Sequence, residues 1–471
     1  MAPDKNNGHG KTDKILKAVI LADAFNDLFQ PLSLNKPRCL LPLCNVPMIE
    51  YTLEFLASSG VKETLVVCKS HVDAIKEYLW QSKWASSLST MKIKTSVVKS
   101  ANTLGEALRE LDETPFVSDF ILCTGVVIAN INIADIVNMH VENPDKDKVV
   151  TMVLQETTSE HRARDKSEEV VYVIEPRTNR LLTLDSATTL PETKIMDLPL
   201  EVITDHPEIE IRNDLMDTNV YVCSPKIFAL FKDSFDYQTM RSDFIQKTSI
   251  SELESATFYA HVLEGTNGLH AEAPRAPINK TSASAGRGRG DKGSAKTEDL
   301  ADDSAAFTNH SGYLAGVVDT SAYDAISRDL IARWAYPLCP DSNPVDPLTY
   351  SYYRGAVYKA ESVVLARESR VDHHVILGTN SKVADFARVS NAVLGADCSI
   401  GERSIVRGSY LFEGAQVGRN SVVEGCILGE RAVILDNVIL ERGCIIGDDV
   451  VIGPNVRLAP FTRIGRWMQE M

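Results

Sequence analysis

The sequence contains no apolar run close to the roughly 20 residues that a membrane-spanning helix needs. Its first 14 residues are polar and charged, so they lack the apolar core of a signal peptide. The nine cysteines include no Cys-x-x-Cys pair, which argues against both a zinc site and a disulfide framework. We therefore expect a cytosolic protein that makes no membrane contact and keeps reduced, mostly buried thiols.

Positive charge is also scarce. There are 49 lysines and arginines against 64 aspartates and glutamates, and the formal net charge is −15. A chain with this balance repels a phosphate backbone, so direct DNA binding is not expected as its main role. The same balance favours contact with basic protein surfaces.

The length of 471 residues exceeds the roughly 250–300 at which a single core stops growing, so we expect two domains. After a disordered N-terminus at 1–14, apolar runs and helical periods alternate, which is typical of an open α/β sheet. This pattern predicts a doubly wound α/β domain over 15–340. The expected segments are strands at 17–22, 63–68, 93–98 and 120–124, and helices at 47–60, 72–78 and 104–111.

Residues 265–311 interrupt this pattern, because Gly, Ala, Ser, Lys and Asp dominate there and a Gly-Arg run occupies 286–290. We interpret the segment as a disordered insert; RNA contact by the Gly-Arg run is the alternative. Ordered structure resumes where Tyr323, Ile326, Leu330 and Trp334 follow helical spacing, and Pro337 is expected to end that helix.

From residue 341 to 471 the period changes to six, with aliphatic residues recurring and small or turn residues following several of them. A six-residue period predicts a left-handed parallel β-helix, because each short strand forms one side of a triangular coil and points one aliphatic residue inward. One phase slips by a residue between Val389 and Leu394. The inward positions are Leu377, Val383, Val389, Leu394, Ile400, Val406, Ile446, Ile452, Leu458 and Ile464.

The stretch from Val19 to Val61 resembles the opening of the nucleotidyltransferases that join a sugar phosphate to a nucleotide. In that family a glycine-rich loop and its arginine hold the phosphates, and a metal-binding Asp follows a central strand. Here the loop carries Asp23 and Asp27, Ala24 and Asn26 replace glycines, and Leu28 stands at the arginine position. Arg38 replaces the second lysine of a Lys-Pro-Lys segment that begins at Lys36, and Val126 stands at the metal position.

These departures predict a degenerate nucleotide pocket formed by Asp23, Leu28, Lys36, Arg38 and Val126. Lys36 and Arg38 would be its residual anion contacts. We assign no catalytic residue, no metal and no cofactor to it, since valine cannot ligate Mg²⁺ and an anionic loop repels a triphosphate. Sugar-1-phosphate nucleotidyl transfer, the activity of an NDP-sugar pyrophosphorylase, remains the alternative function.

A second resemblance is carried by segments spread along residues 17–465, which include 40–43, 49–56, 76–78, 130–133, 235–238, 243–244, 322–329, 333–338 and 353–355. These segments are similar to one branch of this superfamily, the epsilon subunits of eukaryotic translation initiation factor 2B. The resemblance implies a role in guanine-nucleotide exchange on initiation factor 2 within a cytosolic hetero-oligomer, beside a gamma-type subunit and others. It also implies a C-terminal helical exchange domain that this chain lacks, so we expect no autonomous exchange.

In that family an Asn-Phe pair of the first domain lies near the contact with the substrate factor. The matching residues here are Ser234 and Phe235, so the aromatic is kept while the amide is replaced. Asp236 follows directly. The resemblance therefore implies that Ser234, Phe235 and Asp236 contact the partner.

One further class of activity arises from the repeats themselves. Hexapeptide β-helices often carry acyl transfer with a histidine base, and His373 and His374 lie in the repeat region. Solvent-exposed turn histidines are the preferred interpretation, because nothing near them in the sequence indicates an acyl-carrier pocket.

Overall fold

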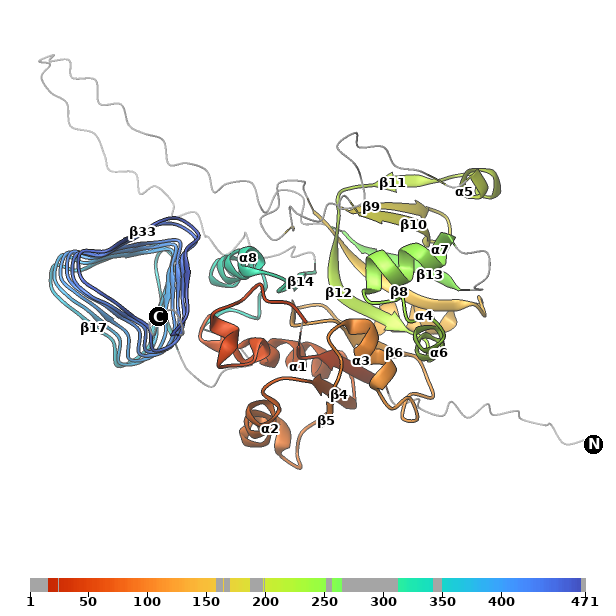
Figure 1. Cartoon of the computed structure of the whole chain (residues 1–471), viewed down its shortest axis with the longest axis horizontal. Coiled ribbons are helices and arrows are strands. Elements are labelled where there is room, and N and C mark those ends of the chain that lie inside the picture. The colour runs from red at the N-terminus through yellow and green to blue at the C-terminus, as the bar shows by residue number, and fades with distance from the viewer. Residues whose placement is uncertain are drawn as a thin grey trace, which may run out of the picture.

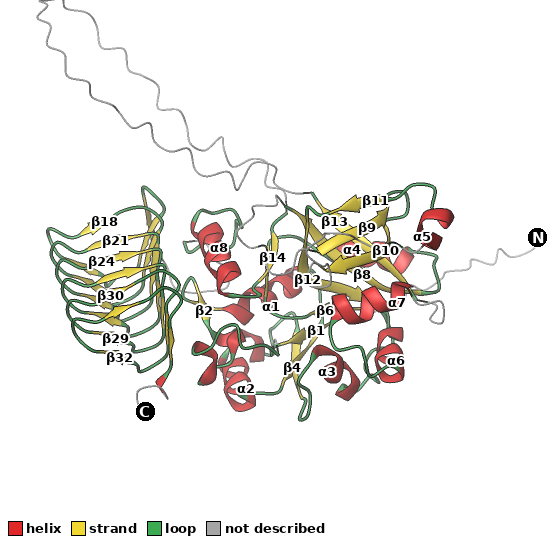
Figure 2. Cartoon of the chain, turned by 45° about the horizontal axis from the view of Figure 1, so that its top comes forward, coloured by secondary structure: helices red, strands yellow, loops and turns green. Residues whose placement is uncertain are grey.

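The computed structural model describes residues 16–23, 25–157, 164, 170–186, 198, 200–250, 256–264, 312–341 and 350–466. The predicted disordered segments at 1–14 and 265–311 lie outside this part of the chain. Figure 1 and Figure 2 show two bodies side by side, a sheet domain covered by helices and a triangular β-helix. No helix within the described ranges is long and apolar enough to cross a bilayer.

The first body is built on a ten-stranded mixed sheet. Strands β6, β1, β4 and β5 run parallel, as predicted, whereas β12 is antiparallel to both of its neighbours. In spatial order the strands are β11 (Glu210–Arg212), β9 (Val170–Glu175), β10 (Arg180–Ser186), β13 (Thr257–Leu263), β8 (Lys148–Glu156), β12 (Leu215–Cys223), β6 (Phe120–Cys123), β1 (Lys17–Leu21), β4 (Glu63–Cys68) and β5 (Lys92–Val97).

Strand β1 explains why the sequence reads as one continuous apolar run. Ala18 and Ile20 point into one apolar core, while Val19 and Leu21 point into the other, on the opposite face of the sheet. Both faces are covered, so no residue of the run meets water. The helices are α1 (Met48–Ser58), α2 (Val72–Gln81), α3 (Leu104–Glu110), α4 (Ala134–Glu142), α5 (Leu200–Asp205), α6 (Lys226–Asp233), α7 (Gln246–Ile250) and α8 (Thr320–Ile331).

Short strands and helical turns join these larger elements, and two of them, β7 and β14, lie near the domain boundary. Strand β14 pairs antiparallel with β7, so residues 314–316 lie against the sheet domain just before α8. The short elements are η1 (Leu32–Leu34), η2 (Arg38–Leu40), β2 (Pro42–Leu43), β3 (Val46–Pro47), η3 (Lys83–Ala85), β7 (Val127–Ala129), η4 (Met240–Ile245) and β14 (Leu314–Gly316).

Helix α8 is shorter than predicted. Its last residue is Ile331, and Arg333 adopts a left-handed conformation at φ 70°. The prediction that the helix extends past Trp334 to Pro337 was therefore wrong. The reason is a tight C-terminal turn, in which the Trp334 amide donates to the Asp329 carbonyl at 2.9 Å.

The second body confirms the predicted β-helix, with three parallel sheets that form the sides of a triangular prism (Figure 1). An antiparallel strand β15 (Ser351–Tyr353) precedes the first coil. One side holds β16 (Val357–Lys359), β19 (Val375–Leu377), β22 (Ala392–Leu394), β25 (Tyr410–Leu411), β28 (Ile427–Leu428), β31 (Ile445–Ile446) and β34 (Arg463–Ile464). The second holds β17 (Val364–Leu365), β20 (Lys382–Val383), β23 (Ser399–Ile400), β26 (Gln416–Val417), β29 (Val433–Ile434) and β32 (Val451–Ile452). The third holds β18 (Arg370–Val371), β21 (Arg388–Ser390), β24 (Ile405–Arg407), β27 (Val422–Glu424), β30 (Ile439–Leu440) and β33 (Arg457–Leu458).

The phase slip seen in the sequence is a difference in coil length. Leu377 pairs with Leu394, 17 residues later, whereas Ile446 pairs with Ile464, 18 residues later. The shorter coils omit one residue at the corner that leads from the third sheet into the first. The inward aliphatic column continues across that corner without a break.

The two bodies share one apolar core. The Tyr323 ring of α8 packs edge-on against Tyr410 of β25, with ring centroids 5.1 Å apart. The Tyr410 hydroxyl donates to Asp324 Oδ1 at 2.7 Å, and the Tyr358 hydroxyl donates to the Ile331 carbonyl at 2.9 Å. Helix α8 is therefore the main platform on which the β-helix rests.

Candidate functional site

A cleft of about 350 Å³ opens at the carboxyl ends of the parallel strands, where α/β sheets bind their ligands. The segment after β1 forms one wall, and residues 238–242 form the opposite wall. Amide and hydroxyl side chains line much of it: Asn26, Asn102, Thr103, Asn219, Gln238, Thr239 and Ser242.

Asp23 does not line this cleft. Its carboxylate instead accepts hydrogen bonds from the Ser70 amide at 2.9 Å and the Ser70 hydroxyl at 2.6 Å, and from the Lys69 amide. The side chain therefore ties the loop after β1 to the loop after β4. Leu28, by contrast, lines the cleft and is 39% exposed, so an apolar side chain stands at the predicted arginine position.

Arg38 reaches the cleft, yet its guanidinium is already occupied. It donates to the Val317 carbonyl, to the Val318 carbonyl at 2.6 Å and to Asn26 Oδ1 at 3.2 Å. The group also lies 4.5 Å over the Phe29 ring, and burial lowers the pKa of Arg38 to about 10. Through these contacts Arg38 links the end of β14 to the loop after β1, so its role is structural.

The second cation of the cleft wall is Arg241, and it is also compensated. Its Nε lies 3.4 Å from Asp217 Oδ2. The Tyr221 hydroxyl donates to the same carboxylate, and desolvation raises the pKa of Tyr221 well above its usual range. Both arginines that line the described cleft are thus bound to acceptors of the protein itself. Neither is free to neutralise the charge of a triphosphate.

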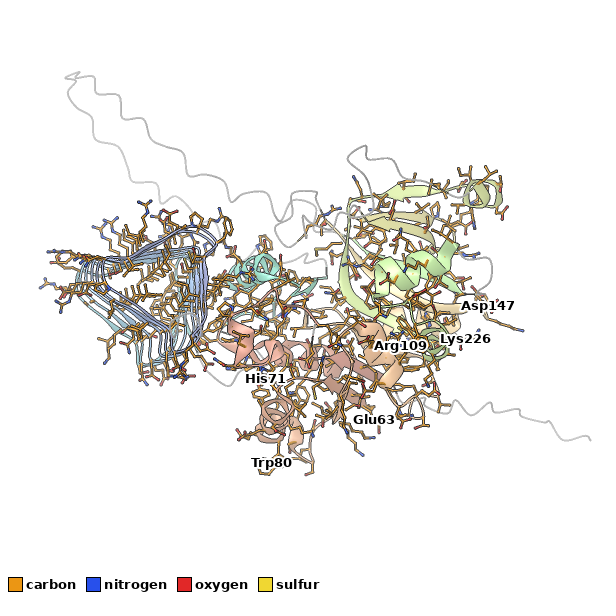
Figure 3. All side chains as sticks on the ribbon, viewed as in Figure 1. Glu63, His71, Trp80, Arg109, Asp147 and Lys226 are labelled. Carbon is orange, nitrogen blue, oxygen red and sulfur yellow. The ribbon has the colours of Figure 1, made fainter. Side chains whose placement is uncertain are left out.

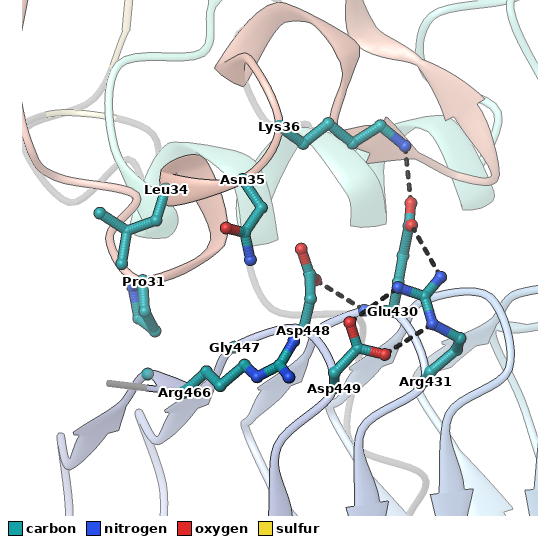
Figure 4. A pocket seen from close by; sticks show the side chains of 11 residues that line it. Pro31, Leu34, Asn35, Lys36, Glu430, Arg431, Gly447, Asp448, Asp449 and Arg466 are labelled. Carbon is teal, nitrogen blue, oxygen red and sulfur yellow. Dashed lines mark hydrogen bonds and ion pairs between the residues drawn. The ribbon is translucent and has the colours of Figure 1, made fainter. Parts of the chain in front are cut away.

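Lys36 lies outside the cleft, although it is only two residues from Arg38. Its ammonium group forms an ion pair with Glu430 of the β-helix, with Nζ 2.6 Å from Oε1 (Figure 4). Next to this pair, Arg431 holds Asp449 and the Glu430 amide donates to Asp448. The structure therefore places Lys36 at the contact between the two domains rather than beside Arg38.

We expect the pair between Lys36 and Glu430 to contribute about 0.5–1 kcal/mol, since both side chains are partly shielded from water. A double-mutant cycle with Lys36→Met and Glu430→Gln measures this coupling directly in urea unfolding. The coupling should shrink in 1 M salt, where the Debye length falls to about 3 Å. A coupling energy near zero at low salt would contradict the contact.

Val126 is buried and its side chain joins the apolar core that faces the β-helix side of the sheet. Its carbonyl accepts from the Val317 amide at 3.0 Å. The residue at the predicted metal position thus fills space in the core. Among the described residues, no group of three or more His, Cys, Asp or Glu side chains could hold a metal ion.

The exchange-motif match lies on an exposed turn between α6 and η4. Phe235 is 75% exposed, Asp236 is exposed and Ser234 is half-buried at the end of α6. A single exposed apolar side chain is common on protein surfaces, so the exposure of Phe235 alone does not identify an interface.

Sequence reasoning missed the side chains that brace this turn. Arg109 of α3, labelled in Figure 3, donates from Nη1 to the carbonyls of Phe231, Ser234 and Tyr237, each at 3.2 Å. Its guanidinium also lies 5.5 Å over the Phe235 ring. Gln238 Nε2 donates to the Phe235 carbonyl at 2.7 Å. No local pattern marks Arg109, since its partners lie more than 120 residues away.

His373 and His374 lie at a corner of the β-helix, where His374 adopts a left-handed conformation at φ 54°. Their rings stack edge to face at 5.3 Å, and His373 is exposed. Burial lowers the pKa of His374 below its usual range. The interpretation as solvent-exposed turn histidines agrees with the position of His373, whereas His374 is half-buried.

Comparison with known proteins matches both bodies. The family model of the "EIF2B subunit epsilon LbH domain" matches residues 354–458, and that of nucleotidyl transferases matches residues 17–163. The translation initiation factor eIF2B subunit epsilon of Schizosaccharomyces pombe is 35% identical over 389 residues, which cover 81% of this chain and 50% of the relative. The epsilon subunit of Dictyostelium discoideum is 32% identical over 371 residues, covering 78% and 45%.

A gamma subunit of eIF2B from Schizosaccharomyces pombe is more distant, at 21% identity over 247 residues that cover 51% of this chain and 53% of the relative. The chain spans about half the length of the epsilon subunits that it matches. Both of its domains and their order agree with the nucleotidyltransferase-like and β-helix parts of that family. The chain therefore belongs to the eIF2B epsilon family.

Proposed function

We propose that this protein is a subunit of the initiation factor 2B complex, the guanine-nucleotide exchange factor for initiation factor 2. Its part is to assemble with the other subunits and to contact the substrate factor through Ser234, Phe235 and Asp236. The observation that carries the contact is the Phe235 ring, which is 75% exposed on a turn held by Arg109 and Gln238. A fixed aromatic binds with little loss of conformational entropy.

The assembly part of the proposal is supported by the relatives. A gamma subunit is similar to half of this chain. We propose that a gamma-type subunit of similar two-domain build sits beside this subunit in the complex. The net charge of −15 favours contact with basic partner surfaces, and a soluble translation factor would work in the cytosol.

Nucleotidyl transfer is the alternative, and the cleft argues against it. A transferase needs free cations and a metal ligand beside the phosphates. In this cleft Arg38 and Arg241 are engaged by protein acceptors and Leu28 is apolar, while Val126, at the predicted metal position, is buried in the core. We propose that the cleft has no transferase activity.

Replacing Phe235 by alanine is expected to weaken binding of initiation factor 2 to the assembled complex by roughly 10- to 100-fold, the range of a central aromatic contact. The ring is 75% exposed and its contact with the Arg109 guanidinium lies at the surface, so the stability of the free subunit should change little. Binding is measured with labelled initiation factor 2 on complexes that contain this chain or its variant, together with release of labelled GDP.

The matched control is Leu88→Ala, since Leu88 is 90% exposed on the same domain and far from the turn in sequence. It should leave binding within about twofold. Equal binding by the Phe235→Ala complex would refute the contact surface. Failure to co-purify with a gamma-type subunit, together with NDP-sugar synthesis in a parallel assay, would restore the transferase alternative.

A further inference from the structure

A second cavity, of about 210 Å³, lies where the start of α8 meets the flank of the β-helix. Three arginines from separate segments line it: Arg328 of α8, Arg442 from the corner before β31, and Arg463 of β34. This cavity is separate from the cleft at the ends of the parallel strands, since no lining residue is shared.

The floor of the cavity is a column of glycines. Gly408, Gly425 and Gly443 occupy the same corner of successive coils, in left-handed conformations with φ of 59°, 59° and 83°. A Cβ atom on Gly425 would stand 2.9 Å from Arg442 Cγ, and one on Gly443 would stand 2.4 Å from the Phe461 ring. Side chains at this corner would displace the walls, so the glycines keep the cavity open.

The charge inside the cavity is strongly positive. Its one acidic lining residue is Asp324, which pairs with Arg328 at 2.9 Å and accepts from the Tyr410 hydroxyl at 2.7 Å. Among the ion pairs of the described residues, none involves Arg442 or Arg463. Both side chains are exposed, and Arg463 Nη1 donates to the Gln30 carbonyl at 3.4 Å. Three arginines and one aspartate line the cavity, so two of the arginines have no carboxylate partner among its lining residues, in a chain whose net charge is −15.

Two further features fit an anion that carries an organic group. Thr320 and Ser321, hydroxyl residues at the start of α8, line the cavity. The end of this helix is capped by Asp319, whose side chain accepts from the Ala322 amide at 2.6 Å. Phe461 stands at the rim and is 76% exposed, so its ring offers a flat apolar face next to the arginines.

We propose that this cavity binds a small phosphate monoester. The dianion matches the two arginines that have no carboxylate partner in the lining, and the planar guanidinium of arginine pairs well with phosphate oxygens. The organic part would lie against the Phe461 ring. A cavity of this size is too small for a nucleoside triphosphate, whereas it accommodates a phosphate with a small substituent.

The test titrates the full chain with inorganic phosphate and with phenyl phosphate by isothermal calorimetry at low salt. Both should bind, and phenyl phosphate should bind more tightly. Arg442→Gln and Arg463→Gln should each weaken both ligands at least tenfold. Phe461→Ala should remove only the advantage of phenyl phosphate, because it leaves the arginines in place.

Arg403→Gln is the matched control, since Arg403 is an exposed arginine at another corner of the β-helix and does not line the cavity. It should bind both ligands as the unchanged protein does. The proposal is overturned if neither ligand binds at millimolar concentration, or if Arg403→Gln weakens binding as much as Arg442→Gln. Inorganic phosphate binding as tightly as phenyl phosphate would also overturn it, because the ester group would then have no role.

Discussion

Replacing Arg38 by alanine is expected to lower the free energy of unfolding by about 3 kcal/mol. The guanidinium is the donor to the Val317 and Val318 carbonyls, and it stacks on Phe29. Alanine leaves these carbonyls without their donor in a site that is 9% exposed, and an unpaired buried polar group costs about 1–3 kcal/mol. Urea unfolding followed by tryptophan fluorescence measures the loss.

Two further variants separate a structural arginine from a ligand-binding one. Arg38→Lys should recover only part of the lost stability, because an ammonium group cannot present the planar fork that reaches both carbonyls. Leu28→Ala, in the wall of the same cleft, should cost less than about 1 kcal/mol because Leu28 is 39% exposed. If Arg38→Ala unfolded at the same urea concentration as the unchanged protein, Arg38 would be free to serve a ligand instead.

Much of the fold could be predicted because its signals are local. In β1 the adjacent residues Ala18 and Val19 belong to different cores. A strand of a sheet covered on both faces therefore appears in the sequence as an unbroken apolar run. In the β-helix, Leu377 and Leu394 stack because the chain returns to the same place after each coil. Each coil has three sides of about six residues, and this repeated geometry produces the six-residue period in the sequence.

The helix end at α8 and the antiparallel half of the sheet were harder to predict. The turn at Arg333 needs a left-handed residue, and no glycine or asparagine marks it. Strand direction across the sheet depends on which strands meet in space, as when β12 inserts between β6 and β8. Pairing of that kind leaves no period along the chain.

The residues of the candidate site likewise divide into those that a local motif predicts and those whose position depends on distant contacts. Leu28 and Arg38 were assigned to one cleft because the family's motif places them there, and both line it. Lys36 belongs to the same motif, yet its partner Glu430 lies 394 residues away on the other domain. The contact between the two domains sets the direction of the Lys36 side chain, and nothing in the motif predicts that contact.

The turn that carries Phe235 depends on a close contact that the sequence does not reveal, and Gly105 tests it. Gly105 lies in the first turn of α3, and its amide donates to the Gln238 carbonyl at 3.0 Å. A Cβ atom there would stand 1.8 Å from the Tyr237 carbonyl oxygen. Tyr237 is buried against Phe231 and Phe244, so the turn cannot move aside without disturbing that cluster.

Gly105→Ala is therefore expected to destabilise the protein by about 2–3 kcal/mol, the upper range for forcing an extra group into a packed region. It should also weaken binding of initiation factor 2, because Gln238 and Arg109 hold the Phe235 turn from this side. Gly125→Ala is the control, since a Cβ atom at Gly125 meets nothing within 4 Å and Gly125 has no left-handed backbone. Unfolding and binding are measured on both variants, and equal stability of the two would mean that α3 does not set the position of the Phe235 turn. If Gly105→Ala loses more binding free energy than unfolding free energy, the effect lies in the Phe235 turn itself. We expect this result because Arg109 and Gln238 brace that turn.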